Sequence, residues 1–531
     1  MTEEEALRRR IGQLLIFGFE GQIVPDHIVD LIRDQYLGNI ILFSRNVGTP
    51  EKLAGLNAAL QTLAREHGQD LPLTVAADQE NGVVRRLPLS VPGLPGNMAL
   101  GAIGDPQQAR RSGEMTGLLL RSLGINFNLA PVLDVNNNPK NPVIGVRSFG
   151  DQAEAVARLG AAFAVGLQAR GVIACGKHFP GHGDTSVDSH LDLPAIPHTR
   201  ERLDTVELLP FKAAIEAGID CIMTAHVVFP AMEPDRIPAT LSKRVLTGLL
   251  RDDLNFRGVL TTDCLEMNAI SEAVGVGRGA VESLKAGADM VMVSHRLDRQ
   301  VAAVNAIWEA VRQGELSENR INEAYERVAR LKKERLQDAA PGPDWPELIR
   351  QADALSKDLS TAAVTRLTAA KQPLPQNPQR VLVLVDDSAP MMVAAGRTGP
   401  ESLLEETLAR MLPGAQVTPL HFPAGLQNQS ADQVLEQAAA ADVVMAGVNG
   451  DRNPAYLEIL ERMADQPIPQ ATVLLRSPYD ATRVPAAPNL IACYENTPWM
   501  VEAAVQAAFG GRAGGALPVD VSEAFPRGHR A

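Results

Sequence analysis

The chain has 531 residues, a formal net charge of −13, 45% hydrophobic residues and four cysteines. Its length favours two or three domains. The acidic balance argues against a nucleic-acid partner, because phosphate contacts need a basic surface. No apolar run approaches the roughly 20 residues that cross a bilayer, and the widely spaced cysteines suggest neither a disulfide framework nor a zinc site. The acidic N-terminus differs from a signal peptide, so we expect a soluble cytoplasmic protein.

Eight short apolar runs alternate with amphipathic helical patterns over the first part of the chain. We predict strands at 14–19, 39–43, 73–77, 126–132, 172–176, 221–225, 259–262 and 290–293. The clearest helical patterns cover 52–66, 151–170, 200–217 and 272–286. Eight strand–helix units predict a (β/α)8 TIM-type barrel within residues 1–340. An open doubly wound sheet is the rival, which the lack of a GxGxxG motif after the first strand weakens.

A second domain follows the predicted barrel. Residues 341–379 suggest a linker, with a helix over 345–370 and a proline-containing stretch over 372–379. Within residues 380–531, apolar runs at 380–385, 442–448 and 472–476 alternate with helical patterns. This pattern predicts a smaller three-layer α/β/α sandwich.

Polar residues follow several of the predicted barrel strands. Asp78 follows the third strand, Asp134 the fourth and Asp263 the seventh. The segment 177–190 follows the fifth strand and holds three histidines, two aspartates and one lysine. Because the carboxyl ends of parallel barrel strands share one rim, we expect a functional site there.

These residue types favour carbohydrate chemistry. Carboxylates and basic side chains bind sugar hydroxyls, and glycoside cleavage needs a carboxylate near the anomeric carbon and a proton donor for the leaving oxygen. We predict Asp263 as the nucleophile. Asp188 lies two residues before His190, and a histidine exchanges protons near neutral pH. We therefore predict His190 as the general acid/base and Asp188 as its partner.

The sequence KHFPGHGDT at 177–185, followed by DSH at 188–190, resembles the glycoside hydrolase family 3 β-N-acetylglucosaminidases of the NagZ type. Further segments agree in the same order: DQENG at 78–82, APVLDV at 130–135, GVRSF at 145–149, MTAH at 223–226 and GVLTTD at 258–263. The resemblance covers about residues 11–335. Residues 380–531 resemble, more weakly, the second domain that some members carry.

The resemblance implies a role for each matching residue. Asp263 would form a glycosyl-enzyme, with His190 and Asp188 as the acid/base pair. The residues that would hold the terminal N-acetyl sugar are Asp78, Arg86, Arg147, Lys177 and His178. The implied activity is a retaining β-N-acetylhexosaminidase that needs no metal or cofactor. Its implied substrates are small carbohydrates, GlcNAc-β-1,4-MurNAc muropeptides or chito-oligosaccharides, which places it in peptidoglycan recycling.

Several alternatives stay open. A phosphorylase would use the same intermediate, because a neutral histidine does not repel phosphate as a glutamate would. A β-glucosidase or xylosidase of the same family is disfavoured by the Asp-Ser-His segment, and a non-catalytic cell-wall sugar sensor by the complete catalytic set. We interpret His182 and Asp184 as residues that shape the loop, and Cys264 as a packed thiol. The leaving group, the oligomeric state and the role of the second domain remain open.

Overall fold

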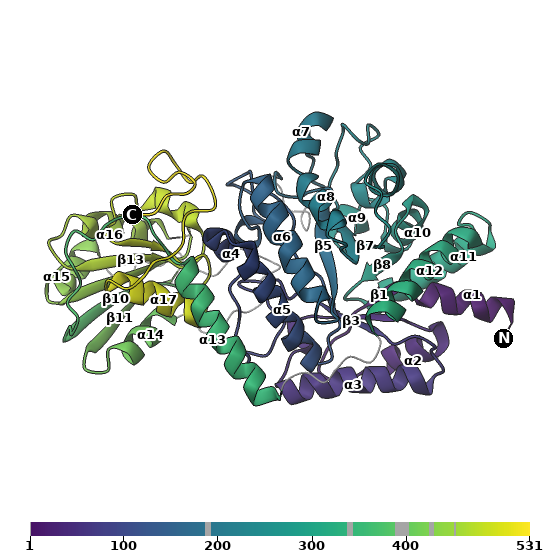
Figure 1. Ribbon diagram of the computed structural model, residues 1–531, viewed down its shortest axis with the longest axis horizontal. Coiled ribbons are helices and arrows are strands. Elements are labelled where there is room, and N and C mark those ends of the chain that lie inside the picture. The colour runs from purple at the N-terminus through teal and green to yellow at the C-terminus, as the bar shows by residue number, and fades with distance from the viewer. Residues whose placement is uncertain (1, 186–192, 337–343, 388–402, 424–429, 451–452) are drawn as a thin grey trace.

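The computed structural model describes residues 2–185, 193–336, 344–387, 403–423, 430–450 and 453–531. Eight parallel strands close into a barrel, and six further strands form a second sheet (Figure 1). This arrangement confirms the predicted TIM-type barrel followed by an α/β domain.

The barrel strands are short and almost wholly buried, as expected for parallel strands that are covered by helices. They are β1 (Leu15–Phe17), β2 (Asn39–Leu42), β3 (Thr74–Ala77), β4 (Phe127–Asn128), β5 (Ile173–Phe179), β6 (Cys221–Thr224), β7 (Val259–Cys264) and β8 (Met290–Val293). The pairing of Ile16 in β1 with Met292 in β8 closes the barrel.

Helices surround these strands and begin at recognisable caps. The Thr49 hydroxyl accepts the Lys52 N–H, and Pro50 occupies the first position of α3, where its missing N–H has no cost. The helices are α1 (Glu3–Gly12), α2 (Asp26–Gln35), α3 (Pro50–Glu66), α4 (Asn97–Ile103), α5 (Pro106–Ser122), α6 (Ala153–Gln168), α7 (Arg200–Thr205), α8 (Leu209–Glu216), α9 (Asn268–Ser271), α10 (Val276–Ala286), α11 (Leu297–Arg312) and α12 (Glu318–Arg335). Shorter turns are η1 (Ser44–Asn46), η2 (Gly145–Arg147) and η3 (Ala239–Leu241), and η4 (Arg244–Asp253) is a π-helix. In the part of the chain that the structure describes, no helix combines the length and apolar composition of a membrane span.

Several barrel elements differ from the predicted ranges. β5 extends to Phe179, so Lys177 and His178, which we expected in the loop after strand five, belong to the strand. The single helix expected over 200–217 is two, α7 and α8, because Pro210 starts a new helix. The helix expected from 272 begins at Val276, after Gly275 with φ +80°. Strand four is limited to β4, and beyond it the pairing with β5 resumes only as an isolated bridge between Val132 and Lys177.

The second sheet has the order β11-β10-β12-β13-β14-β9, with only β9 antiparallel to its neighbour. Its strands are β9 (Thr365–Arg366), β10 (Arg380–Asp386), β11 (Gln416–Phe422), β12 (Val443–Val448), β13 (Gln470–Leu474) and β14 (Leu490–Ala492). The helices are α13 (Trp345–Ala363), α14 (Leu403–Met411), α15 (Ala431–Ala439), α16 (Pro454–Ala464) and α17 (Pro498–Ala508), with the short turn η5 (Pro478–Arg483). α17 packs against α13 and α14, and α15 packs against α16, which gives the layers of a sandwich.

Three strands of the second sheet are missing from the sequence prediction. β11 is a half-exposed edge strand that contains Pro419, so it lacks an apolar run. β9 and β14 are too short to leave a pattern. β9 and α13 both lie within the segment 341–379 that we predicted as a linker.

The core of the second domain extends into the barrel. Its buried apolar cluster includes side chains from the segments that follow β3 and β4, among them Val83, Val84, Met98 and Val146. Helix α13 runs from the barrel side of the molecule to the second domain (Figure 1) and contacts both α4 and α17. The two domains therefore share apolar packing next to the barrel rim.

At the opposite end of the barrel, Asp289 forms ion pairs with three arginines. This aspartate directly precedes β8 and is fully buried. Its carboxylate contacts the guanidinium groups of Arg251 at 2.6 Å, Arg320 at 2.8 Å and Arg327 at 2.9 Å. It also accepts the N–H of Leu260 at 3.0 Å. The cluster joins β7, β8, η4 and α12 at the end that is remote from the predicted site.

We predict that Asp289→Ala lowers the free energy of unfolding by about 3–5 kcal/mol, because it removes the carboxylate shared by the buried Arg251 and the partly buried Arg320 and Arg327. Urea denaturation at pH 7 measures this loss. The matched variant Asp298→Ala removes an exposed partner of Arg296 and should change the free energy by no more than about 0.5 kcal/mol. Equal effects of the two substitutions would contradict this role for Asp289.

Candidate active site

A cavity of about 370 Å³ opens at the C-terminal ends of the barrel strands, in the size range of small-molecule sites. The structure brings six of the residues predicted from the sequence into its wall: Asp78, Arg86, Arg147, Lys177, His178 and Asp263. The other two, Asp188 and His190, lie outside the described residues.

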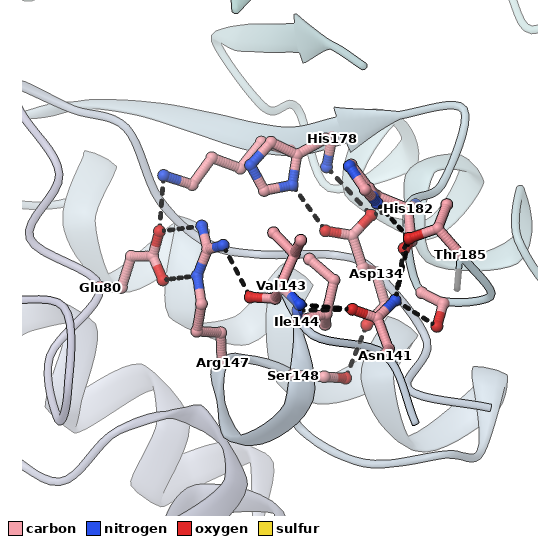
Figure 2. Close-up of polar contacts among 12 residues, drawn as sticks. Glu80, Asp134, Asn141, Val143, Ile144, Arg147, Ser148, His178, His182 and Thr185 are labelled. Carbon is pink, nitrogen blue, oxygen red and sulfur yellow. Dashed lines mark hydrogen bonds and ion pairs between the residues drawn. The ribbon is translucent and has the colours of Figure 1, made fainter. Parts of the chain in front are cut away.

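Glu80 is a wall residue to which the sequence analysis gave no role. Its carboxylate takes two hydrogen bonds from the Arg147 guanidinium, at 2.7 and 2.8 Å (Figure 2). It also contacts the Lys177 ammonium at 2.6 Å. All three side chains are at least 95% buried. Glu80 follows Asp78 by two positions, and side chains at this spacing in an extended segment point to the same face. The sequence therefore offered this spacing as a sign that Glu80 lies in the same wall as Asp78.

The charges in this cluster stabilise one another. Burial alone would raise the pKa of Glu80, but Arg147 and Lys177 hold it well below its ordinary value. Burial would likewise lower the pKa of Lys177, but Asp78 and Glu80 raise it. Glu80, Arg147 and Lys177 are therefore all charged at neutral pH, and the cluster gives the cavity a fixed set of donors and acceptors.

A local irregularity in β5 places two consecutive residues in the same wall. The pairing of β5 with β6 changes register between Gly176 and Phe179, and such bulges redirect side chains. Lys177 and His178 lie within this interval, and both line the cavity. Besides Glu80, the Lys177 ammonium contacts Asp78 at 2.6 Å.

Asp134 orients the histidine side of the cavity. One of its carboxylate oxygens lies 2.7 Å from Nδ1 of His178, and the other accepts the backbone N–H of His182 at 2.6 Å (Figure 2). Asp134 is fully buried. The sequence analysis placed it on the rim without a role, and the structure shows a positioning residue that fixes the His178 ring.

His182 and Asp184 make local contacts within the loop. Nδ1 of His182 lies 2.9 Å from the Thr185 hydroxyl, and Asp184 contacts His198 at 2.5 Å. Burial, reinforced by the nearby His178, lowers the pKa of His182 to about 4, so its ring is neutral at pH 7. These contacts support the interpretation that both residues shape the loop, and His182 also lines the cavity.

Asp263 faces the cavity from the end of β7. In the closed order of eight strands, β7 lies across the barrel from β3, which Asp78 directly follows. The Asp263 side chain is partly exposed, and its Oδ1 accepts the Cys264 N–H at 2.7 Å. The cavity therefore has the Glu80 cluster on one side and the Asp263 carboxylate on the strand opposite β3.

Cys264 is unsuited to act as a nucleophile itself. Burial, together with the charge of Glu266, raises the pKa of its thiol to about 12, so the reactive thiolate is scarce at neutral pH.

Two side-chain groups have the spacing of possible metal ligands within the described residues: Cys264, Glu266 and His295, and separately Asp184, His198 and Glu207. In the first group the Arg45 guanidinium lies 3.0 Å from Nδ1 of His295, which disfavours a cation there.

Residues 6–331 match the protein family described as glycosyl hydrolase family 3 N-terminal domain. A β-hexosaminidase A from Pseudoalteromonas piscicida is 34% identical over 388 residues, which are 68% of this chain and 65%, just under two thirds, of that protein. A solved family 3 β-N-acetylglucosaminidase from Paenibacillus sp. str. FPU-7 superposes with a TM-score of 0.90 at 40% identity, covering 97% of this chain and 99% of that one. A β-glucoside phosphorylase superposes at 0.80 with 20% identity, over 98% and 97% of the two chains, a likeness of fold alone.

We predict that Glu80→Gln lowers the free energy of unfolding at pH 7 by about 3–5 kcal/mol, because two buried cations lose part of their compensation. The depressed pKa of Glu80 contributes stability above the unfolded value of about 4.3, and that stability disappears as the pH falls further. The difference between the variant and the parent should therefore shrink from pH 5 to pH 3 in urea denaturation.

Glu20→Gln is the matched control for this measurement, because Glu20 is an exposed partner of Arg45. Its effect should stay within about 0.5 kcal/mol. A Glu80→Gln variant as stable as the parent at pH 7 would show that the cluster contributes no net stability.

Proposed function

Because the chain belongs to glycosyl hydrolase family 3, we propose that it is a retaining exo-β-N-acetylglucosaminidase. The observation that carries this proposal is one cavity that combines a carboxylate, Asp263, with a separate set of donors and acceptors on β5 and in the loops after β3 and β4. The relatives named β-hexosaminidase and β-N-acetylglucosaminidase support the choice of sugar.

In the proposed reaction, the cavity holds the terminal sugar. Asp78, Arg86, Arg147, Lys177 and His178 bind its hydroxyl and N-acetyl groups. Each is a hydrogen-bonding side chain that the fold fixes before the substrate arrives, and such preorganisation favours the reacting geometry. A cavity of about 370 Å³ suits one sugar ring with its substituent, which supports cleavage from the chain end.

The covalent step uses Asp263. Its carboxylate attacks the anomeric carbon, the bond to the leaving oxygen breaks, and His190 gives that oxygen a proton. In the second step His190 removes a proton from water, whose oxygen displaces Asp263 from the anomeric carbon. Asp188 stabilises the charged form of His190, as in other Asp–His pairs. Two displacements at the same carbon return the original β configuration.

The proposed natural substrates carry β-linked GlcNAc at one end, such as muropeptides with a GlcNAc-β-1,4-MurNAc unit or chito-oligosaccharides. Peptidoglycan recycling in the cytoplasm is the setting that the sequence suggests for muropeptides. This part of the proposal rests on the sequence motifs, and competition between purified muropeptides and chito-oligosaccharides for turnover tests it.

We predict that Asp263→Asn lowers kcat by about 10⁴-fold or more, and that His190→Ala lowers it by about 10² to 10⁴-fold, both with an unchanged far-UV spectrum. Rates on an aryl β-GlcNAc substrate measure the loss, and NMR of the first product should show the β-anomer. A near-parental rate in either variant would remove that residue from its proposed role. Tight binding without turnover by the parent would instead favour a sugar sensor.

The alternative of a phosphorylase differs only in the second step, where phosphate would replace water as the acceptor. We predict that the parent protein releases free GlcNAc at the same rate in buffers with and without about 10 mM phosphate. This concentration is about tenfold above the upper end of typical KM values, so it would saturate a phosphate-binding site. Mass spectrometry of the products provides the measurement. Accumulation of GlcNAc 1-phosphate would make the protein a phosphorylase and leave the role of Asp263 intact.

A further inference from the structure

The second domain reaches the cavity wall through Glu495, which follows β14. Its side chain is buried. One carboxylate oxygen accepts the Gly96 N–H at 2.7 Å, and the other accepts the Thr497 hydroxyl at 2.9 Å. Gly96 belongs to the barrel domain, where it directly precedes α4. A side chain from the second domain therefore fixes the start of a barrel helix.

A short series of contacts links this point to the cavity. Asn97, the first residue of α4, donates from its side chain to the Arg147 carbonyl at 2.7 Å. Arg147 in turn holds Glu80. Glu495, Glu80, Asn97 and Arg147 also surround a small cavity of about 10 Å³. The Glu80–Arg147 pair thus faces the sugar cavity on one side and Glu495 on the other.

Close backbone packing leaves room for the Glu495 carboxylate. Gly82 and Gly96 approach each other so closely that a Cβ on Gly82 would lie 2.8 Å from the Gly96 Cα. The same Cβ would lie 2.4 Å from a carboxylate oxygen of Glu495. Both glycines belong to the loop after β3, which also carries Asp78, Glu80 and Arg86. The contact with Glu495 therefore needs glycine at position 82.

The loop after β4 is held by the second domain as well. Asn136 lies two residues after Asp134, and its side chain donates to the Tyr479 hydroxyl at 2.9 Å. Asp151, four residues after Arg147, contacts Arg527 at 2.7 Å and accepts the Asp520 N–H at 2.7 Å. Among the described residues, those that line the sugar cavity all come from the barrel domain.

We propose that the second domain acts as a support for the sugar-binding wall, and that Glu495 is a positioning residue for the Glu80–Arg147 pair. It sets the affinity for the terminal sugar without touching it. This inference rests on the proposed function for its kinetic consequence, but its structural consequence can be measured without turnover.

The environment of Glu495 explains which substitution preserves the contact. Burial raises its pKa to about 7, while the Gly96 and Thr497 hydrogen bonds and the charge of Arg85 act against this rise. Much of the Glu495 population is thus uncharged near neutral pH. Glutamine has the same shape and keeps an acceptor for the Gly96 N–H, whereas alanine removes it.

The test compares Glu495→Ala and Glu495→Gln with the parent in the full chain. With an aryl β-GlcNAc substrate, Glu495→Ala should raise KM about tenfold or more and change kcat little, and Glu495→Gln should stay within about threefold of the parent in both. In hydrogen exchange, amides within residues 79–98 should exchange about tenfold faster in Glu495→Ala, and at the parental rate in Glu495→Gln.

Tyr456→Phe is the matched control, because it loses buried hydrogen bonds to Leu384 and Gly447 inside the second domain and should leave KM and these amides unchanged. Gly82→Ala is a second variant that displaces the Glu495 carboxylate from the barrel side. It is expected to raise KM and speed up amide exchange as Glu495→Ala does, and it replaces Glu495→Ala in the test if that variant does not fold. Parental KM and parental exchange in both Glu495→Ala and Gly82→Ala would overturn the inference. If the parent has no turnover, the proposed function fails, and the exchange rates alone decide the inference.

Discussion

The buried Glu80 carboxylate lies between two cations, the Arg147 guanidinium and the Lys177 ammonium, which belong to different parts of the barrel. Arg147 arrives from the loop after β4, and Lys177 from the bulged part of β5. Two buried cations without a carboxylate would carry a large desolvation penalty, so the three groups require one another. Their mutual contacts hold three strand ends in fixed positions around the cavity, and the sugar-binding role proposed for the wall depends on that rigidity.

The proposed mechanism assigns sugar binding and bond cleavage to opposite sides of the cavity. The wall formed by β3, β5 and the loop after β4 presents fixed donors and acceptors, while Asp263 stands on β7 across the barrel. Asp134 adds a second level of support, because its carboxylate holds both His178 and the backbone of His182. Support extends to the second domain through Glu495. Neither Asp134 nor Glu495 would touch the proposed sugar. Asp134 acts through His178, and Glu495 acts through the Glu80–Arg147 pair.

Much of this arrangement could be predicted from the sequence, because strand ends in a barrel share one rim. That rule was enough to group Asp78 with Asp263. The bulge in β5 depends on register and was not predictable from residue types, and a lone Asp134 gave no sign of its partner. The contact between Gly96 and Glu495 joins residues 399 positions apart. Such contacts leave no local pattern, and neither did the short strands β9 and β14.

We propose that this cavity binds a terminal N-acetylglucosamine. The most direct measurement is the initial rate on an aryl β-GlcNAc and on the matching aryl β-glucoside, in phosphate-free buffer near pH 7. We predict a strong preference for the GlcNAc substrate, because the buried wall would bind the N-acetyl group as well as the hydroxyls. Equal rates, or a preference for the glucoside, would contradict it.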